Sequence, residues 1–427
     1  MSDVELSPAA IARRERVILF CLAAVHFTSI VDFMVVMPLG PQLEKKLGLG
    51  PAEFGMIVAA YTYAAGLAGL VATMVLDRFA RRTAFLAIFA GFILGTFACG
   101  LARSYTALLV ARFLTGAFGG ILGGIAMAII GDVFPENRRG TATGLLMSAF
   151  AIASIAGVPL GLTLGLRYGW QSPFLVLAAL CLPIFAMAFR ALPRLDDHLQ
   201  HRSSEPPLDR LKEMFSHPNH LRAFTLMTAL TLGAFAVFPY MSPYLVFNVG
   251  LREDQLPFVY ITGGALSLFG SPLVGRLSDR YGKLRVFRYV TPVNAVLFLT
   301  LTLLPQSPLA VAVGLSGLLM LSNVGRMVPA MALITSSVEP RLRGGFMGAN
   351  AAVQHMAAGV GTSIAAMILA QPKDQPIQHY PVVGAIAALV SLSTLFLAGR
   401  LKIAAIAPAA ESPEIIGEAI LATEGGM

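Results

Sequence analysis

Residues 105–133 read YTALLVARFLTGAFGGILGGIAMAIIGDV, an apolar run that contains one cation, Arg112, and no acid before Asp132. Crossing the hydrocarbon core of a bilayer takes about 20 apolar residues, so this run predicts a membrane-spanning helix. Arg112 would then lie inside the membrane, where a cation costs at least about 2.5 kcal/mol near the helix centre. A buried cation of this kind predicts a functional site and a partner for its charge elsewhere in the chain.

The same run carries Gly116, Gly120 and Gly124 at every fourth position. Residues four apart lie on one face of a helix, and glycines there let the backbones of neighbouring helices approach closely. We therefore expect another helix to pack tightly on this face.

The composition of the 427-residue chain, 56% hydrophobic and 13% charged, indicates a polytopic membrane protein. Lys and Arg outnumber Asp and Glu by 31 to 23. Basic residues gather in the cytoplasmic loops of membrane proteins, so this excess gives no reason to expect nucleic-acid binding. Cys21, Cys99 and Cys181 all lie in apolar runs, where free Cys behaves as a small hydrophobe. We expect no disulfide framework, no metal site and no cofactor.

Apolar runs between charged or Pro- and Gly-rich breaks predict an all-α protein with twelve membrane spans. They lie at roughly 17–39, 53–76, 83–102, 105–133, 141–166, 171–192, 220–247, 256–278, 285–304, 308–338, 344–370 and 379–399.

Twelve crossings put both termini on one side of the membrane, and the basic residues indicate that this side is the cytoplasm. Most Lys and Arg residues fall in the breaks on the side of the termini. The opposite side holds only Lys45, Lys46, Arg103, Arg167, Arg252 and Lys373.

This topology predicts a cytoplasmic signal from a reporter fused after Arg202 and an external signal from one fused after Lys373. Reporters that are active on opposite sides of the membrane measure both positions. A cytoplasmic signal at Lys373 would contradict the count of twelve spans.

The longest polar break, residues 193–219, divides the spans six and six and predicts a cytoplasmic linker. The domains would then be an N-terminal bundle at 1–192, a C-terminal bundle at 220–402 and a disordered cytoplasmic tail at 403–427. The basic turn that follows Asp77 recurs after Asp279, about 200 residues later, which indicates two structural copies of the same orientation.

These turns carry a resemblance to a known family. The stretch GRLSDRYGK at 275–283 resembles the loop signature of the major facilitator superfamily, and the copy at 73–82 has Thr73 and Ala80 where that pattern has glycines. Leu108, Arg112 and Gly116 resemble the fourth-helix motif of proton-coupled members. GVPLG at 157–161 resembles the fifth-helix antiporter motif, which usually has Gly directly before Pro.

The resemblance covers essentially all twelve spans. It implies two pseudo-symmetric six-helix bundles that rock about a central site, a small-molecule substrate exchanged for protons, and no enzymatic activity. Within the superfamily the pattern is similar to the twelve-helix drug:proton antiporters of the arabinose-efflux-permease type, with spinster-like lipid transporters as near relatives. We expect a monomer in the bacterial inner (plasma) membrane.

Asp32 is the only carboxylate well inside a predicted span. Asp32 and Arg112 each lie seven residues, or about 10 Å, from the outer end of their spans, so the two side chains share a depth. We expect them to form an ion pair that alternates with proton binding, and the alternative is a static structural pair.

The resemblance also implies an interdomain latch at the cytoplasmic face that stabilises the outward-open state, with ordinary topology charge as the alternative. Asp77 and Asp279 would be its acids, and Asp132 and Glu136 are candidates to join it. The basic residues of the candidate latch are Arg78, Arg81, Arg138, Arg139, Arg280, Lys283, Arg341 and Arg343.

Gly157, Gly161 and Gly165 form a ridge along the fifth predicted span, with Pro159 beside it. If the superfamily arrangement holds, this ridge faces the eighth span across the two bundles and makes a sliding seam. The alternative is tight packing within one bundle.

Arg326 is a second buried cation, and its partner is either an anionic substrate group or a backbone carbonyl. The other candidates for the substrate cavity are His26, Tyr61, Phe235, Phe238, Tyr260, Asn323, Asn350, Gln354 and His355. The alternative to substrate contact is a packing role: the histidines would be neutral and packed among other side chains, and the aromatic residues would pack between helices or lie at the membrane interface.

The sequence favours a proton-coupled exporter of a small amphipathic or drug-like solute. A lipid or lysolipid transporter and a sugar or metabolite exporter are the alternatives within transport. An intramembrane enzyme is disfavoured, because the sequence contains no HExxH, no GxSxG and no phosphate-binding loop ending in GK[ST]. A sensor without transport remains open.

Overall fold

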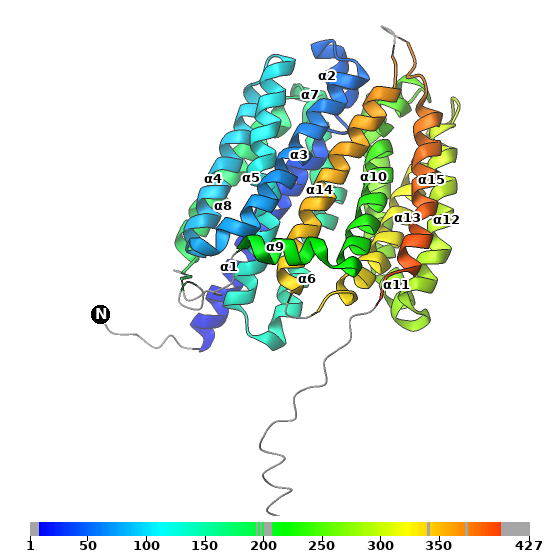
Figure 1. The fold of residues 1–427 in the computed structure, drawn as a ribbon. Coiled ribbons are helices and arrows are strands. Elements are labelled where there is room, and N and C mark those ends of the chain that lie inside the picture. The colour runs from blue at the N-terminus through cyan, green and yellow to red at the C-terminus, as the bar shows by residue number, and fades with distance from the viewer. Residues whose placement is uncertain are drawn as a thin grey trace, which may run out of the picture.

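The computed structural model describes residues 8–193, 195–196, 199, 207–339, 342–371 and 375–402. Within these residues the chain is almost entirely helical, and twelve helices are long and apolar enough to cross a membrane. The long helices run side by side in Figure 1. The chain is therefore an integral membrane protein with the predicted number of spans.

The first six spans form one bundle around buried phenylalanines of α4 that pack on α5, such as Phe89 and Phe92. The helices of this bundle are α1 (Pro8–Val35), α3 (Pro51–Val75), α4 (Arg81–Leu101), α5 (Tyr105–Val133), α6 with α7 (Glu136–Ile152 and Val158–Tyr168) and α8 (Ser172–Ala191).

The last six spans form a second bundle, which meets the first where α14 packs along α3 and where α11 packs against α6 and α7. The helices of this bundle are α10 (Pro218–Phe247), α11 (Leu256–Tyr281), α12 (Lys283–Thr302), α13 (Leu309–Ser336), α14 (Arg343–Ile368) and α15 (Tyr380–Gly399).

Two short helices lie at opposite ends of the molecule (Figure 1). Helix α9 (Pro207–Ser216) falls in the predicted linker and lies crosswise toward the end at which α1 begins, which we call the near end. Helix α2 (Gly40–Leu47) lies at the opposite end, the far end. The predicted tail at 403–427 lies outside the described residues.

Helix α2 corrects the predicted first span, 17–39, because the membrane helix ends at Val35 and the chain turns before α2 begins at Gly40. The apolar run continues through this turn to Leu39, so hydrophobicity alone does not mark the end of the helix.

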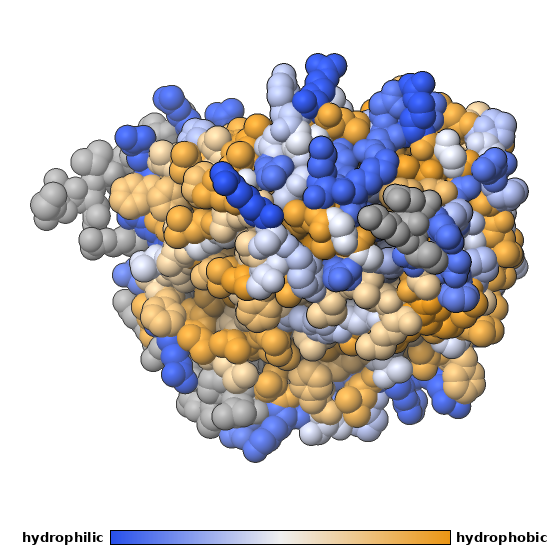
Figure 2. Space-filling model, turned by 90° about the horizontal axis from the view of Figure 1, so that it is seen from above, coloured by the Kyte–Doolittle hydropathy of each residue, from blue (hydrophilic) through white to orange (hydrophobic). Residues whose placement is uncertain are grey.

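The two bundles are joined at the far end. Lys45 of α2 forms an ion pair of 2.6 Å with Glu253, which precedes α11, and the Tyr240 hydroxyl of α10 donates a hydrogen bond of 3.3 Å to the Pro51 carbonyl of α3. Figure 2, which looks onto this end, shows hydrophilic side chains in separate patches among hydrophobic ones.

The near end is less tightly joined along the contact of α6 and α11. A Cβ atom added at Gly140 or Gly144 of α6, or at Gly275 of α11, would meet no atom within 4 Å. These three glycines therefore make no close contact between the bundles, whereas the far end is joined by the bonds of Lys45 and Tyr240.

Candidate functional site

The structure brings Asp32 of α1 and Arg112 of α5 together in the core of the N-terminal bundle. Nη1 of Arg112 donates to Oδ2 of Asp32 at 2.7 Å and to the Asp32 backbone carbonyl at 3.2 Å. Both side chains are fully buried. The shared depth that the sequence predicts is thus sufficient to pair them.

Two neighbours hold this pair in place. Thr96 of α4 donates from its hydroxyl to Oδ1 of Asp32 at 3.1 Å. The guanidinium carbon of Arg112 lies 4.4 Å from the ring centroid of Tyr61 on α3, a cation–π distance. Four helices therefore contribute one side chain each to the site.

The pair does not use the full hydrogen-bonding capacity of Arg112. Its Nε and Nη2 atoms are buried and have no hydrogen-bond partner within the described residues. A two-pronged Arg–carboxylate pair is stronger than one held through a single nitrogen. The observed pair is held through a single Arg112 nitrogen.

The glycines of α5 set the distance between the helices that carry the site. A Cβ atom at Gly116 would stand 2.2 Å from the Tyr61 carbonyl oxygen, and one at Gly120 would stand 2.4 Å from Cβ of Ala65. The predicted close packing is confirmed at Gly116 and Gly120, where α3 packs, but it is wrong at Gly124, where an added Cβ atom would meet nothing within 4 Å. The contact also fixes the backbone of Tyr61 beside Arg112.

A series of aromatic rings connects the Asp32–Arg112 pair with the C-terminal bundle. The Tyr61 ring lies 5.1 Å from that of Phe33, which in turn lies 5.9 Å from that of Phe235 on α10. Tyr61 and Phe235 were both candidates for the cavity, and this contact series places them on either side of the boundary between the bundles.

Arg326 of α13 lies in a polar cluster inside the C-terminal bundle, and it is almost fully buried. Its guanidinium donates to Asn323 Oδ1, to Ser391 Oγ at 2.9 Å and to the Leu230 carbonyl at 3.0 Å. Asn294 extends the cluster by accepting from Ser391. Among the described residues these partners are all neutral, so the charge of Arg326 has no local anion.

The remaining cavity candidates are scattered. The Tyr260 hydroxyl lies 2.7 Å from Ser242 inside the C-terminal bundle, and Asn350 is buried. His26 faces α5 at Gly123. The other three candidates are only partly buried: Phe238, Gln354 and His355.

At the near end, two ion pairs between described residues join helices within the N-terminal bundle. Arg81 pairs with Asp132 at 3.3 Å, and Arg138 pairs with Glu15 at 2.7 Å. Arg139 lies 3.9 Å from Glu136 on its own helix.

No cross-bundle latch forms between the described residues at this end. Asp279, Arg280 and Arg343 are exposed, and Lys283 donates to Ser336 of its own bundle at 3.0 Å. Arg78 is also exposed, whereas Arg341 and the side chain of Asp77 lie outside the described part of the chain. A latch that stabilises the outward-open state would not be expected in a structure closed at the far end.

The glycine ridge of the fifth span packs inside its own bundle. Cβ atoms at Gly157, Gly161 and Gly165 would each meet a side chain from Val31, Val35 or Leu39 of the first span region. This is the alternative that the sequence left open for these glycines.

The contact across the bundles instead uses the neighbouring π-helical turn, Ala153–Gly157. A Cβ atom at Gly264 of α11 would meet Ile155 of this turn at 2.9 Å. Pro159 lacks a backbone N–H to continue the α-helical hydrogen bonds, and π-helical turns are frequent at functional sites.

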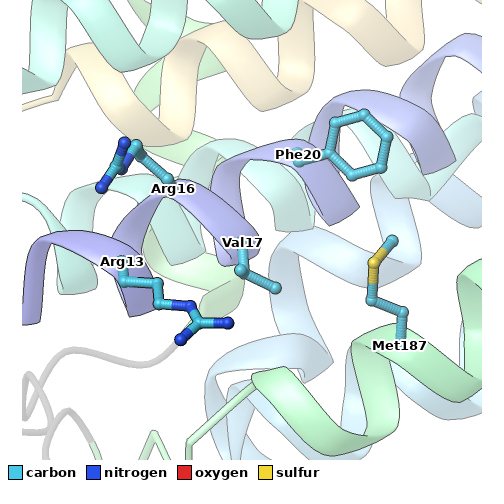
Figure 3. A pocket seen from close by; sticks show the side chains of 5 residues that line it. All are labelled: Arg13, Arg16, Val17, Phe20 and Met187. Carbon is cyan, nitrogen blue, oxygen red and sulfur yellow. The ribbon is translucent and has the colours of Figure 1, made fainter. Parts of the chain in front are cut away.

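A groove of about 380 Å³ lies between α1 and α8 at the near end (Figure 3). Arg13, Phe20 and Met187 contribute to its lining. Phe20 is twelve residues from Asp32 along α1, or about 18 Å, so this groove is separate from the buried ion pair.

Sequence reasoning missed Thr96 and Ser391 as partners of the buried charges, and Asn294 as a partner of Ser391. A lone Thr, Ser or Asn in an apolar span more often bonds its own helix, and no local signal distinguishes these three.

Two helical bundles that enclose buried charges beside their contact define a membrane transporter. The family model for the Major Facilitator Superfamily matches residues 22–362, and the chain belongs to this superfamily. Its members are transporters rather than enzymes, and this protein acts on small-molecule substrates within the bilayer.

Similar proteins agree with this assignment. The chain is 25% identical to the uncharacterized MFS-type transporter YceJ of Bacillus subtilis (strain 168), over 88% of this chain and 93% of the relative. It is 26% identical to a probable sugar efflux transporter of Helicobacter pylori (strain P12), over 61% of this chain and 65% of that one.

The fold is also similar to that of a bacterial homologue of the human lysosomal transporter Spinster, solved in an inward-facing and occupied conformation. The TM-score is 0.73 at 16% identity, with 92% of this chain and 99% of that chain covered.

Proposed function

We propose that this protein is a proton-coupled exporter of a small amphipathic or drug-like solute, resident in a bacterial inner membrane with both termini in the cytoplasm. The observation that carries the proposal is the fully buried ion pair between Asp32 and Arg112. Ionisable residues inside a membrane are costly and mark ion or substrate pathways.

In this proposal Asp32 alternates between an ionised form paired with Arg112 and a protonated form. Protonation removes the negative charge that attracts Arg112 Nη1, which keeps its hydrogen bond to the Asp32 backbone carbonyl. The changed position of Arg112 acts on Tyr61, whose ring connects through Phe33 to Phe235 of the other bundle. Rocking of the two bundles would expose the site to each side in turn.

Two other substrates fit the same machinery. The name of the Helicobacter pylori relative supports a sugar. A lipid or lysolipid is the substrate that the resemblance of the sequence to spinster-like transporters implies. Superfamily members differ in the side chains of the cavity, so the motifs do not distinguish these substrates.

Proton flux in proteoliposomes tests the proposal. Purified protein with a pH-sensitive dye inside the vesicles is given a panel of cationic drugs, sugars and lysolipids. We expect a drug-like member of the panel to drive proton movement. Substrate transport without proton movement would refute the coupling, whereas proton movement with only sugars or lysolipids would select one of the other substrates.

Replacing Asp279 with Asn should weaken the outward-open state, because it removes an acid of the candidate latch. An exposed ion pair is worth at most about 1 kcal/mol, so labelling of a cysteine placed at Ser148 on α6 should rise by no more than about fivefold. Asp254→Asn at the far end is the matched control and should leave the labelling unchanged. Unchanged labelling and transport in Asp279→Asn would make Asp279 an ordinary topology charge.

A further inference from the structure

Glu44 of α2 is a buried acid outside the membrane spans. Its side chain belongs to a residue that is only 6% exposed, and neither carboxyl oxygen has a hydrogen-bond partner within the described residues. Buried carboxylates are ordinarily paired or hydrogen-bonded, because an unpaired buried charge is very costly. The carboxyl group of Glu44 is therefore in an environment that suits its neutral form.

Glu44 lies at the contact between the two bundles. Gly40 is one helical turn earlier on the same face of α2, and a Cβ atom there would meet Pro243 of α10 at 2.8 Å and Phe54 of α3 at 2.9 Å. Leu43 of α2 packs in the same hydrophobic cluster as Tyr240. Glu44 is thus buried on a face of α2 that packs against α3 and α10.

The surrounding groups do not neutralise an ionised Glu44. Burial raises the pKa of Glu44 to about 8, although the neighbouring charge of Lys45 lowers it by a smaller amount. Lys45 itself is paired with Glu253. From α10 the facing titratable group is Tyr240, whose hydroxyl donates to the Pro51 and Thr362 carbonyls.

The acid of α3 nearest in sequence, Glu53, is exposed, and its carboxylate accepts from the Gly50 backbone N–H. Lys46, the other cation of α2, is also exposed. None of these groups of α2, α3 and α10 forms a hydrogen bond with a carboxyl oxygen of Glu44 within the described residues.

We propose that Glu44 is a proton-binding residue of the far-end contact. The two bundles stay together at this contact when the Glu44 carboxyl group carries a proton, and they separate there when it is ionised. The proposal depends on the far-end contact alone and does not require Asp32 to be a coupling residue.

The direction of the pH dependence follows from the two states. In the open state Glu44 is hydrated and its pKa is about 4.3, whereas in the closed state burial raises it to about 8. Between these values the closed state binds more protons, so it is fully favoured at low pH and loses stability as the pH rises. The ratio of open to closed molecules should increase by up to about tenfold per pH unit in this window.

The experiment measures the distance across the far end in the full chain, in lipid nanodiscs, as a function of pH. Spin labels are attached to cysteines introduced at Ala52 of α3 and at Gln306 between α12 and α13, both exposed. The three native cysteines, which are buried, are replaced by alanine. We expect a second, longer distance between the labels to appear, and its population to increase as the pH rises from 5 to 8.

Glu44→Gln keeps the shape of the side chain and fixes it in a neutral form. This variant should stay closed over the same range, with less than a twofold change in the ratio of open to closed molecules. Glu44→Met, also neutral, should behave in the same way. Glu53→Gln, an exposed acid nine residues away, is the matched control and should keep the response of the unmodified protein.

Several results would overturn the proposal. They are a distance that does not change with pH in the unmodified protein, an unchanged response in Glu44→Gln, and failure of both neutral variants to fold, since a neutral residue should suit the closed contact. Asp32→Asn provides the remaining test. The response should persist in that variant, and its disappearance would assign the pH dependence to Asp32 instead.

Discussion

Replacing Asp32 with Asn should abolish proton-driven accumulation of the substrate in proteoliposomes, so that the concentration ratio across the membrane falls to one. Asn has nearly the volume of Asp and resembles its protonated form, but it cannot carry a proton between the two states. Substrate binding and downhill exchange should survive, since a neutral residue at this position still permits the bundles to move.

Arg112→Ala should also lose coupling, for a different reason. It leaves the Asp32 carboxylate buried with Thr96 as its remaining side-chain partner, and removing one member of a buried pair costs roughly 3–5 kcal/mol. Adding Arg112→Ala to Asp32→Asn should cost little more than either change alone, because the two residues act as a unit.

Arg112→Lys is not a conservative replacement at this site. The planar guanidinium bonds both the carboxylate and the backbone carbonyl of Asp32 while it stacks on Tyr61, and an ammonium group does not reproduce this geometry.

The measurement is transport driven by an imposed pH gradient, with Asp254→Asn as the control that removes an exposed acid of the same kind. The control should accumulate substrate normally. Full accumulation by Asp32→Asn would reduce the buried pair to a structural role and refute the proposed coupling.

Gly116→Ala should destabilise the folded protein, although alanine is the better helix former. The added Cβ atom would stand 2.2 Å from the Tyr61 carbonyl oxygen and 2.7 Å from Tyr61 Cα. Backbone atoms cannot rotate away as a flexible side chain does, so α3 and α5 must separate. Overpacking of this kind costs about 1–3 kcal/mol or more, and it also moves the ring that covers Arg112.

Gly124→Ala is the matched control on the same helix, because a Cβ atom at Gly124 would meet nothing within 4 Å. It should be neutral or stabilising by up to about 1 kcal/mol, the difference in helix propensity. Thermal unfolding in detergent compares the two variants. Equal unfolding temperatures would show that α3 and α5 adjust to the extra atom without cost.

The number of spans and the meeting of Asp32 with Arg112 could be predicted from the sequence. Both depend on simple geometry: the length of an apolar run, and the rise of 1.5 Å per residue that places two charges at one depth. The packing of Gly116 on a neighbouring helix was predicted for a related reason, since residues four apart share a helix face.

Other features depend on which helix faces which, and a linear pattern does not contain that information. The ridge at Gly157 has the same spacing as the ridge at Gly116, yet the spacing does not distinguish α1 as its partner from α11. Helix α2 was not predicted, because the apolar run continues through the turn that precedes it. The role of Thr96 depends on a partner that is 64 residues away.

The neutral surroundings of Arg326 have an electrical consequence. If the bundles rock as proposed, a positive charge without a local anion would move through part of the membrane potential during each cycle. One elementary charge that crosses the whole membrane gains or loses about 2.3 kcal/mol per 100 mV. Even a fraction of that displacement would make the rate of interconversion sensitive to voltage, and this would hold for an uncharged substrate as well.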